Sequence, residues 1–163
     1  MSNFHLAEVA VLKHLLIVYH SQTGHTQALA ESVYRGALDY RDDVETRLMK
    51  ACDSGEEELL WADAVIFGTP ENFGYMSGAL KDFFDRTYEA TRDATVGLPY
   101  AIFISAGNDG SGAEFNIDRI ARGYSMKRVS EPLIVRGEVD QAALQQAEEL
   151  GQTLAAALEL GVV

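Results

Sequence analysis

The sequence lacks several features on which other classes of protein depend. Its 163 residues include one cysteine, Cys52. A single thiol excludes an internal disulfide and any CxxC redox or zinc site. No apolar run approaches the roughly 20 residues of a membrane span, and residues 1–13 have no basic start of a secretory signal. We therefore expect a cytoplasmic protein.

Basic residues are also scarce. The chain has 13 Lys and Arg against 25 Asp and Glu, a formal net charge of −12. Such a charge repels the phosphates of nucleic acids and of anionic membranes. We therefore expect neither as a partner, whereas a basic protein surface is compatible with this charge.

Apolar segments alternate with helix-like segments along the chain. Residues 14–19, 64–68 and 100–104 are almost continuously apolar, which is typical of strands covered on both faces of a parallel sheet. Residues 44–48 alternate in polarity, as at a sheet edge, and residues 133–135 form the last strand. The pattern predicts one α/β domain over residues 14–163, after an extension of residues 1–13.

The same pattern predicts a doubly wound, five-stranded parallel sheet of order 2-1-3-4-5, with helices on both faces. Loops 21–26, 69–77 and 105–112 then follow the first, third and fourth strands. Parallel strands bring such loops to one edge of the sheet, so we expect the ligand site there.

The first of these loops, Ser21–Thr26, is a predicted anion site. It lies between a strand and a helix, where backbone N–H groups and the helix dipole converge. It contains no Lys or Arg and matches neither GxxxxGK[ST] nor GxGxxG. A phosphate held by neutral donors would anchor a ligand without being transferred. The alternative is that Thr23 or Thr26 simply caps the helix.

The other two loops could surround a flat ring. In the second loop Phe73 and Tyr75 flank Gly74, where the backbone can approach a ring closely; alternatively, these aromatic side chains fill core space. The third loop carries Asn108 and Asp109 among glycines and could offer amide groups to a ring edge; alternatively, it is an ordinary turn. Because all three loops are expected at the same edge of the sheet, we expect them to bind one common ligand.

The sequence excludes three other kinds of site: a phosphoacceptor site, a hydrolase site and a metal site. A phosphoacceptor receiver needs acidic residues after the first strand and an aspartate ending the third, where this chain has His20-Ser21 and Gly68-Thr69. No GxSxG elbow of a hydrolase is present, and no spacing suggests a metal site. We predict no catalytic side chain and no metal ligand.

Two segments resemble the motifs of a known family. The first is Leu16–Thr26, which resembles the phosphate loop of flavodoxin-like proteins, (S/T)-x-T-G-x-T. The second is Gly68–Ser77 together with Leu80–Thr87. It resembles the G-T-P-x-x-F-G-x-M-S…K-x-F-x-D-R-T segment of tryptophan-repressor-binding-protein-like NAD(P)H:quinone oxidoreductases. The chain is also similar to short-chain flavodoxins, because it lacks the long insertion in the last strand.

The resemblance implies a flavodoxin-like fold that binds FMN non-covalently. Carried over by motif, the residues around the ribityl phosphate would be Ser21, Gln22, Thr23, Gly24, His25 and Thr26. Those bordering the isoalloxazine ring would be Pro70, Glu71, Asn72, Phe73 and Gly74, with Ser105, Ala106, Gly107, Asn108 and Gly110 at its other edge.

The resemblance also implies an FMN-dependent oxidoreductase of the NAD(P)H:quinone reductase type. Its donor would be NAD(P)H or a redox partner protein, and a homo-oligomer is compatible with it. The alternatives are a flavodoxin-type electron-transfer protein without its own substrate pocket and an interaction protein without a cofactor. The chain has little room for added segments between Gly112 and Glu131, and it carries Asn72 at a usually basic position. Beside it, Glu71 is expected to lower the reduction potential of the flavin.

Overall fold

The computed structural model describes residues 11–163 of the chain. Residues 1–10 of the predicted extension lie outside the described residues, and the first strand begins at Lys13. The strands are β1 (Lys13–Tyr19), β2 (Val44–Lys50), β3 (Ala64–Pro70), β4 (Pro99–Ala106), β5 (Lys127–Arg128) and β6 (Leu133–Arg136). The α-helices are α1 (His25–Ala37), α2 (Glu56–Trp61), α3 (Gly78–Thr91), α4 (Ser111–Gly123) and α5 (Gln141–Leu160), and short 3₁₀ turns follow α1 and β2 at Leu38–Tyr40 and Ala51–Asp53.

The sheet has the predicted topology. Its strands are parallel and lie in the order β2-β1-β3-β4-β5. The central strands β1, β3 and β4 are buried almost throughout, whereas β2 alternates between exposed and covered positions at the edge. Side chains cap two of the helices: at the start of α3 Ser77 Oγ accepts from Leu80 N–H, and at the start of α5 Asp140 Oδ1 accepts from Ala143 N–H.

The fifth position of the sheet differs from the single predicted strand. Two short strands share it, because β5 pairs with Pro99 and Tyr100 of β4, while β6 pairs with residues 103–106. Between them, residues 129–132 lie opposite only residues 101–102 of β4, so the chain bulges out of the ladder. Pro132 lies in this bulge and has no N–H to contribute to a ladder.

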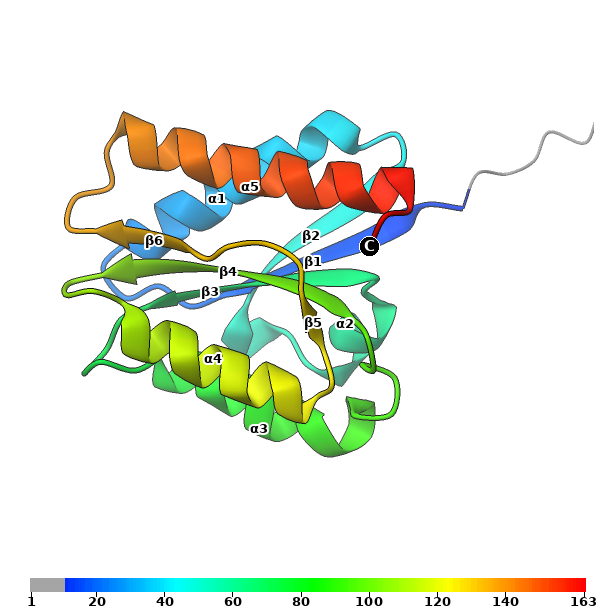
Figure 1. Cartoon of the computed structure of the whole chain (residues 1–163), viewed down its shortest axis with the longest axis horizontal. Coiled ribbons are helices and arrows are strands. Elements are labelled where there is room, and N and C mark those ends of the chain that lie inside the picture. Colours follow the sequence, from blue (N-terminus) through cyan, green and yellow to red (C-terminus); the bar gives the residue numbers. More distant parts are fainter. Residues whose placement is uncertain (1–10) are drawn as a thin grey trace, which may run out of the picture.

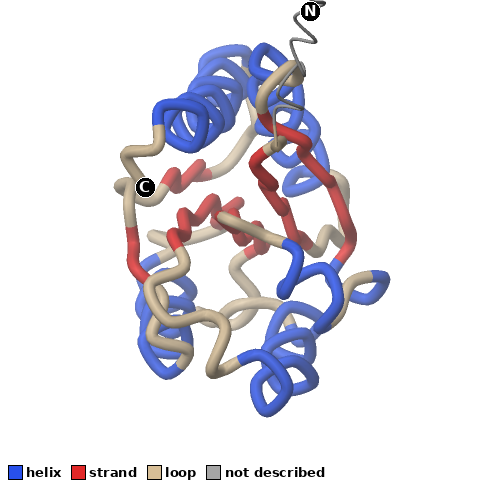
Figure 2. The backbone as a smooth tube through the Cα atoms, turned by 90° about the vertical axis from the view of Figure 1, so that its right-hand side faces the viewer, coloured by secondary structure: helices blue, strands red, loops and turns tan. Residues whose placement is uncertain are grey.

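Helices cover both faces of the sheet (Figures 1 and 2). Alternate side chains of a strand point to opposite faces, so Leu15 and Ile17 pack under α1 and α5, while Leu16 and Val18 pack against the layer of α2, α3 and α4. In Figure 1 the tips of β4 and β6 point to the left, and the carboxyl edge of the sheet lies on that side. Within residues 11–163, no helix combines the length and apolarity that crossing a bilayer requires.

Helices α1 and α5 pack at unusually short range through two glycines. A Cβ atom added to Gly36 would lie 1.9 Å from the backbone oxygen of Glu148, and one added to Gly151 would lie 1.9 Å from that of Val33. At these two glycines, the backbones of α1 and α5 are in direct contact, with no side chain between them. This contact holds α1, which follows the predicted phosphate loop, against the C-terminal helix.

We predict that Gly36→Ala lowers the free energy of unfolding by roughly 1–3 kcal/mol, because α1 and α5 must separate to admit the methyl group. Gly123→Ala is the matched control, since nothing lies within 4 Å of a Cβ at that helical position. Urea unfolding followed by circular dichroism, at equal cofactor content, measures both. Equal midpoints for the two variants would show that the close approach is not required.

Candidate functional site

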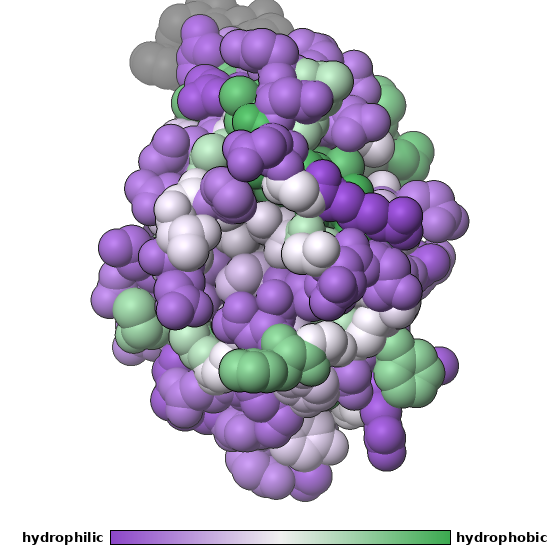
Figure 3. Space-filling view, turned by 90° about the vertical axis from the view of Figure 1, so that its left-hand side faces the viewer, coloured by the Kyte–Doolittle hydropathy of each residue, from purple (hydrophilic) through white to green (hydrophobic). Residues whose placement is uncertain are grey.

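Four loops meet at the carboxyl edge of the sheet and enclose a cavity of about 320 Å³. They follow β1, β3, β4 and β6. Figure 3 faces this edge, where weakly polar residues lie at the centre among predominantly hydrophilic ones. The cavity is lined by Gln22, Thr23, His25, Pro70, Glu71, Asn72, Ser105, Ala106, Gly107, Gly137 and Glu138.

The loop after β1 turns into α1 at Gly24. This glycine is the N-cap residue of α1 with φ 100°, a left-handed conformation that side chains disfavour. No side chain caps the helix; Ser21 Oγ instead accepts from Gly24 N–H at 3.2 Å. The alternative that Thr23 or Thr26 caps α1 is therefore wrong. Within residues 11–163, the N–H groups of the first turn have no side-chain acceptor.

Thr26 provides the strongest sign of a missing ligand in this loop. The residue is 1% exposed, and its Oγ1 atom is buried without a hydrogen-bond partner among residues 11–163. Buried hydroxyl groups almost always find a partner. Together with the helix N-terminus, this hydroxyl fits an anion held by neutral donors, since the cavity lining includes no Lys or Arg. A phosphate monoester matches this donor set.

The loop after β3 is a tight hairpin tied at its base. Asn72 and Tyr75 exchange backbone N–H···O hydrogen bonds, both 2.9 Å long. Between them Phe73 has φ 51° and Gly74 has φ 70°, as in a type I′ turn. Thr69 Oγ1 holds the ends of the loop together, because it accepts from Ser77 N–H and donates to the Pro70 oxygen.

Phe73 has an unfavourable conformation and an unfavourable environment. Its side chain is fully exposed, at 108% of the reference area. Type I′ turns favour Asn or Gly at this position, and a bulky side chain in the left-handed region is strained. The alternative that Phe73 fills core space is wrong, whereas Tyr75 is half-buried and packs against the core. Strain of this kind gathers at functional sites.

Glu71 connects the second loop to the third. Its Oε1 accepts from Asn108 N–H at 2.7 Å, and its Oε2 accepts from Gly110 N–H at 2.8 Å. Gly110 is the N-cap residue of α4, so the carboxylate lies at the start of that helix. Asp109 is occupied locally, since its Oδ1 accepts from Ser111 N–H and Oγ–H. Hydrogen bonds from Ser111 hold the pKa of Asp109 below its usual value.

The structure brings most of the predicted residues together. Nine of them line the cavity: Gln22, Thr23, His25, Pro70, Glu71, Asn72, Ser105, Ala106 and Gly107. Ser21, Gly24, Thr26, Phe73, Gly74, Asn108 and Gly110 are outside its lining but belong to the same three loops. Within residues 11–163 no cluster of His, Cys, Asp or Glu side chains is suited to a metal ion.

Sequence reasoning missed the fourth loop, which supplies Gly137 and Glu138 to the cavity. Gly137 has φ 75° and donates its N–H to the Ala106 oxygen at 3.0 Å. A signal was present, because Gly137 directly follows the last predicted strand, and a strand parallel to its neighbours ends at the same edge as they do. Glu138 is exposed and makes no side-chain hydrogen bond or ion pair within the described residues.

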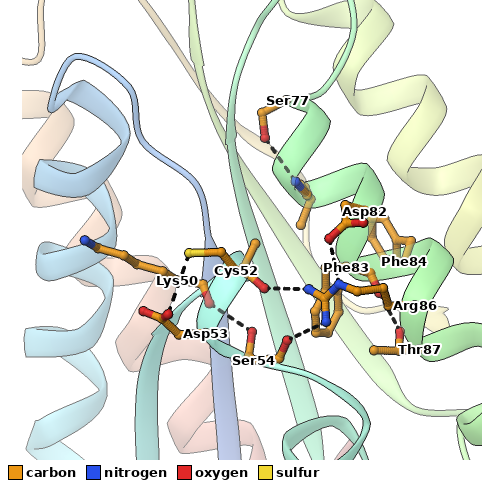
Figure 4. Close-up of polar contacts among 12 residues, drawn as sticks. Lys50, Cys52, Asp53, Ser54, Ser77, Asp82, Phe83, Phe84, Arg86 and Thr87 are labelled. Carbon is orange, nitrogen blue, oxygen red and sulfur yellow. Dashed lines mark hydrogen bonds and ion pairs between the residues drawn. The ribbon is translucent and has the colours of Figure 1, made fainter.

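The second half of the motif that resembles the quinone oxidoreductases is structural. Arg86 on α3 donates from Nη2 to the Ala51 oxygen at 2.9 Å and from Nη1 to the Ser54 oxygen at 3.1 Å (Figure 4). Its Nε also pairs with Asp82 at 2.6 Å. The guanidinium thereby fastens the turn after β2 to α3. It lies outside the cavity lining.

Comparison with known proteins now places the chain in a family. The model of the family described as NADPH-dependent FMN reductase matches residues 35–138 of the 163. The chain belongs to this family. Proteins of this family bind FMN, so the predicted cofactor is confirmed at this level. The activity as an FMN-dependent oxidoreductase stays a prediction. The individual residues that would contact FMN stay predictions.

Individual relatives of this FMN reductase family member include a flavodoxin and a quinone oxidoreductase. A flavodoxin of Aquifex aeolicus is 34% identical over 100 residues, covering 61% of this chain and 54% of that protein. Quinone-oxidoreductase QR2 of Triphysaria versicolor is 34% identical over 119 residues, covering 60% and 58%. The chain spans little more than half the length of these curated relatives.

Solved structures confirm the flavodoxin-like fold. A flavodoxin from the domain Archaea superimposes with a TM-score of 0.78 at 24% identity, covering 90% of this chain and 99% of that chain. A flavodoxin, WrbA-like protein from Agrobacterium tumefaciens gives 0.75 at 23% identity, covering 89% and 96%. At these identities the likeness concerns the fold alone.

We predict that Phe73→Asn raises the free energy of unfolding of the FMN-free protein by roughly 1 kcal/mol, because Asn tolerates the left-handed region. The same variant should bind FMN more weakly, since it removes the exposed ring beside the cavity. Urea unfolding of the FMN-free protein and fluorescence titration with FMN measure the two effects.

Ser125→Asn is the matched control, because Ser125 is the other non-glycine residue with positive φ in residues 11–163, at 58°. It lies just after α4 and outside the cavity lining. Ser125→Asn should leave FMN binding unchanged. Unchanged FMN binding by Phe73→Asn would remove Phe73 from the site.

Proposed function

We propose that this protein is an FMN-dependent oxidoreductase that takes electrons from NAD(P)H and passes them to a quinone-type acceptor. The proposed FMN-binding domain spans residues 14–163. The proposal is carried by one observation: a cavity at the carboxyl edge of the sheet has the N-terminus of α1, which carries no side-chain cap among residues 11–163, on one side and a hairpin with an exposed aromatic residue on the other.

The β1–α1 loop would bind the phosphate of FMN. Its donors are the N–H groups of the first turn of α1, the hydroxyl groups of Ser21 and Thr23, and the buried hydroxyl of Thr26. All of them are neutral. A neutral donor set suits a phosphate that anchors the cofactor and takes no part in the reaction.

The β3–α3 and β4–α4 loops would border the ring. Pro70, Asn72 and Phe73 would lie on one side, with Ser105 to Gly107 at the other edge. Bound FMN supplies the redox chemistry, and the chain's residues supply binding, orientation and electrostatics. The exposed Phe73 would shield one part of the ring from water, while the open side of the cavity would admit a substrate.

The electron donor and acceptor are inferred from chemistry shared with relatives. The family is described as NADPH-dependent, and a relative from Syntrophus aciditrophicus that is 31% identical over 128 residues is called NAD(P)H dehydrogenase (quinone). An open cavity would admit NAD(P)H first and then, after NAD(P)⁺ has left, the quinone.

A second candidate function is electron transfer between proteins. Helix α4 and strand β5 occupy most of residues 111–128, which leaves no added segment there to wall a substrate pocket. The net charge of −12 would favour docking onto a basic partner. One relative, from Aquifex aeolicus, is named a flavodoxin.

Turnover separates the two candidates. The purified protein should release FMN on denaturation, and the FMN-loaded protein should oxidise NADH or NADPH continuously when a soluble quinone is supplied. Failure to turn over, combined with rapid reduction by a reductase partner, would establish the electron carrier instead. Failure to hold FMN would refute both.

The phosphate site is tested by Thr26→Val. The change removes a buried hydroxyl that has no partner, so the FMN-free protein should be at least as stable as the wild type. Loss of a hydrogen bond to a charged phosphate should weaken FMN binding roughly tenfold or more. Titration with FMN measures the affinity.

Thr91→Val is the matched control, because Thr91 is 0% exposed and its hydroxyl donates to the Thr87 oxygen at 2.7 Å. This variant should lose stability and keep its affinity for FMN. If Thr26→Val binds FMN as tightly as the wild type, the phosphate is held elsewhere.

A further inference from the structure

The carboxylate of Glu71 is fully engaged by the protein. Each oxygen accepts one backbone N–H of the β4–α4 loop, from Asn108 at 2.7 Å and from Gly110 at 2.8 Å. The two donors lie 37 and 39 residues away in sequence. Hydrogen bonds to a charged acceptor are stronger than those between neutral groups. The side chain is therefore a bidentate link between two loops.

The bases of the same two loops are joined by a backbone hydrogen bond from Glu71 N–H to the Ser105 oxygen at 2.9 Å, and the loops touch again farther out. Gly112, in the first turn of α4, lies so close to the hairpin that a Cβ there would be 1.8 Å from the Gly74 oxygen. Asn116 Nδ2 donates to the Gly112 oxygen at 2.7 Å and braces that turn. Backbone packing alone sets this second contact. Only the contact through Glu71 depends on a carboxylate.

Helix α4 begins beside Glu71, and this placement changes how its charge acts. Gly110 is the N-cap residue of α4, so the carboxylate faces the positive end of the helix dipole. Two N–H dipoles and the helix terminus together offset the negative charge. The field that Glu71 exerts on a nearby ring is accordingly weaker than the sequence led us to expect.

We propose that Glu71 is a positioning residue for flavin binding, which holds the β4–α4 loop against the β3–α3 hairpin so that both edges of the ring site keep their spacing. The inference rests on the proposed FMN function. It assigns to Glu71 a geometric role in place of the expected electrostatic one. The N–H groups of Asn108 and Gly110 are bound to Glu71 and are not free to meet the ring.

Two substitutions separate geometry from charge. Glu71→Gln keeps the shape but has one acceptor oxygen, so at least one of the two N–H groups loses its partner. Glu71→Asp keeps the charge but is one methylene shorter and cannot reach both N–H groups. Glu138→Gln is the matched control, because Glu138 lines the same cavity and accepts no hydrogen bond within the described residues.

The first readout needs no cofactor. Amide hydrogen exchange of the FMN-free protein, followed by NMR, should quicken roughly tenfold or more at Asn108 or Gly110 in both Glu71 variants. Glu138→Gln should leave both amides unchanged. Unchanged exchange in both Glu71 variants would show that the link does not hold the loop, and would overturn the proposal.

The second readout follows FMN. Its dissociation rate should rise roughly tenfold in Glu71→Gln and in Glu71→Asp. It should not rise in Glu159→Gln, which removes a charge from the exposed end of α5, outside the cavity lining. The reduction potential of Glu71→Gln should shift no more than that of Glu138→Gln. A Glu71→Asp protein that binds FMN like the wild type, with a potential altered only in Glu71→Gln, would establish charge as the role and refute positioning.

The two proposals fail in distinguishable ways. A wild-type protein that retains no FMN refutes the proposed function, and the amide exchange still decides whether Glu71 holds the loop. A protein that binds FMN equally well in all variants keeps the proposed function and refutes the positioning role.

Discussion

The burial of β1, β3 and β4 on both faces is the constraint on which the rest of the structure depends. Strands that are apolar on both faces need helices above and below, and parallel strands need a helical connection between each pair. All the loops that lead into those helices then emerge at one edge. The cavity, the start of α1 and the strained hairpin lie together there because the sheet is parallel.

Two local costs of the structure lie at this edge. Buried hydroxyl groups on α3, such as those of Thr87 and Thr91, are hydrogen-bonded, whereas that of Thr26 is not. In residues 11–163 the one comparable hydroxyl is that of Thr46 on edge strand β2, which nothing in the structure explains. Phe73 adds an exposed ring on a strained turn. Costs that concentrate around one cavity are typical of a functional site.

The N-termini of α4 and α1 both lie at this edge, and they differ in whether a side chain of the protein accepts their N–H groups. The start of α4 is filled by the protein's own carboxylate, Glu71, which binds two N–H groups. The start of α1 has no side-chain acceptor. A helix N-terminus attracts an anion in either case. The chain thus supplies the anion at the start of α4 itself, and the start of α1 is the one compatible with the proposed phosphate site.

The sequence by itself determined the sheet order, the strand-to-helix loop at Ser21–Thr26 and the class of the ligand, because these depend on signals within short segments. Tertiary structure decided the rest. The bonds of Glu71 to Asn108 and Gly110 and those of Arg86 to Ala51 and Ser54 each join residues that are far apart in the chain. The division of the fifth strand depends on its register against β4. Such contacts leave no local pattern, since the identity of a partner is settled only when the loops are brought to one edge.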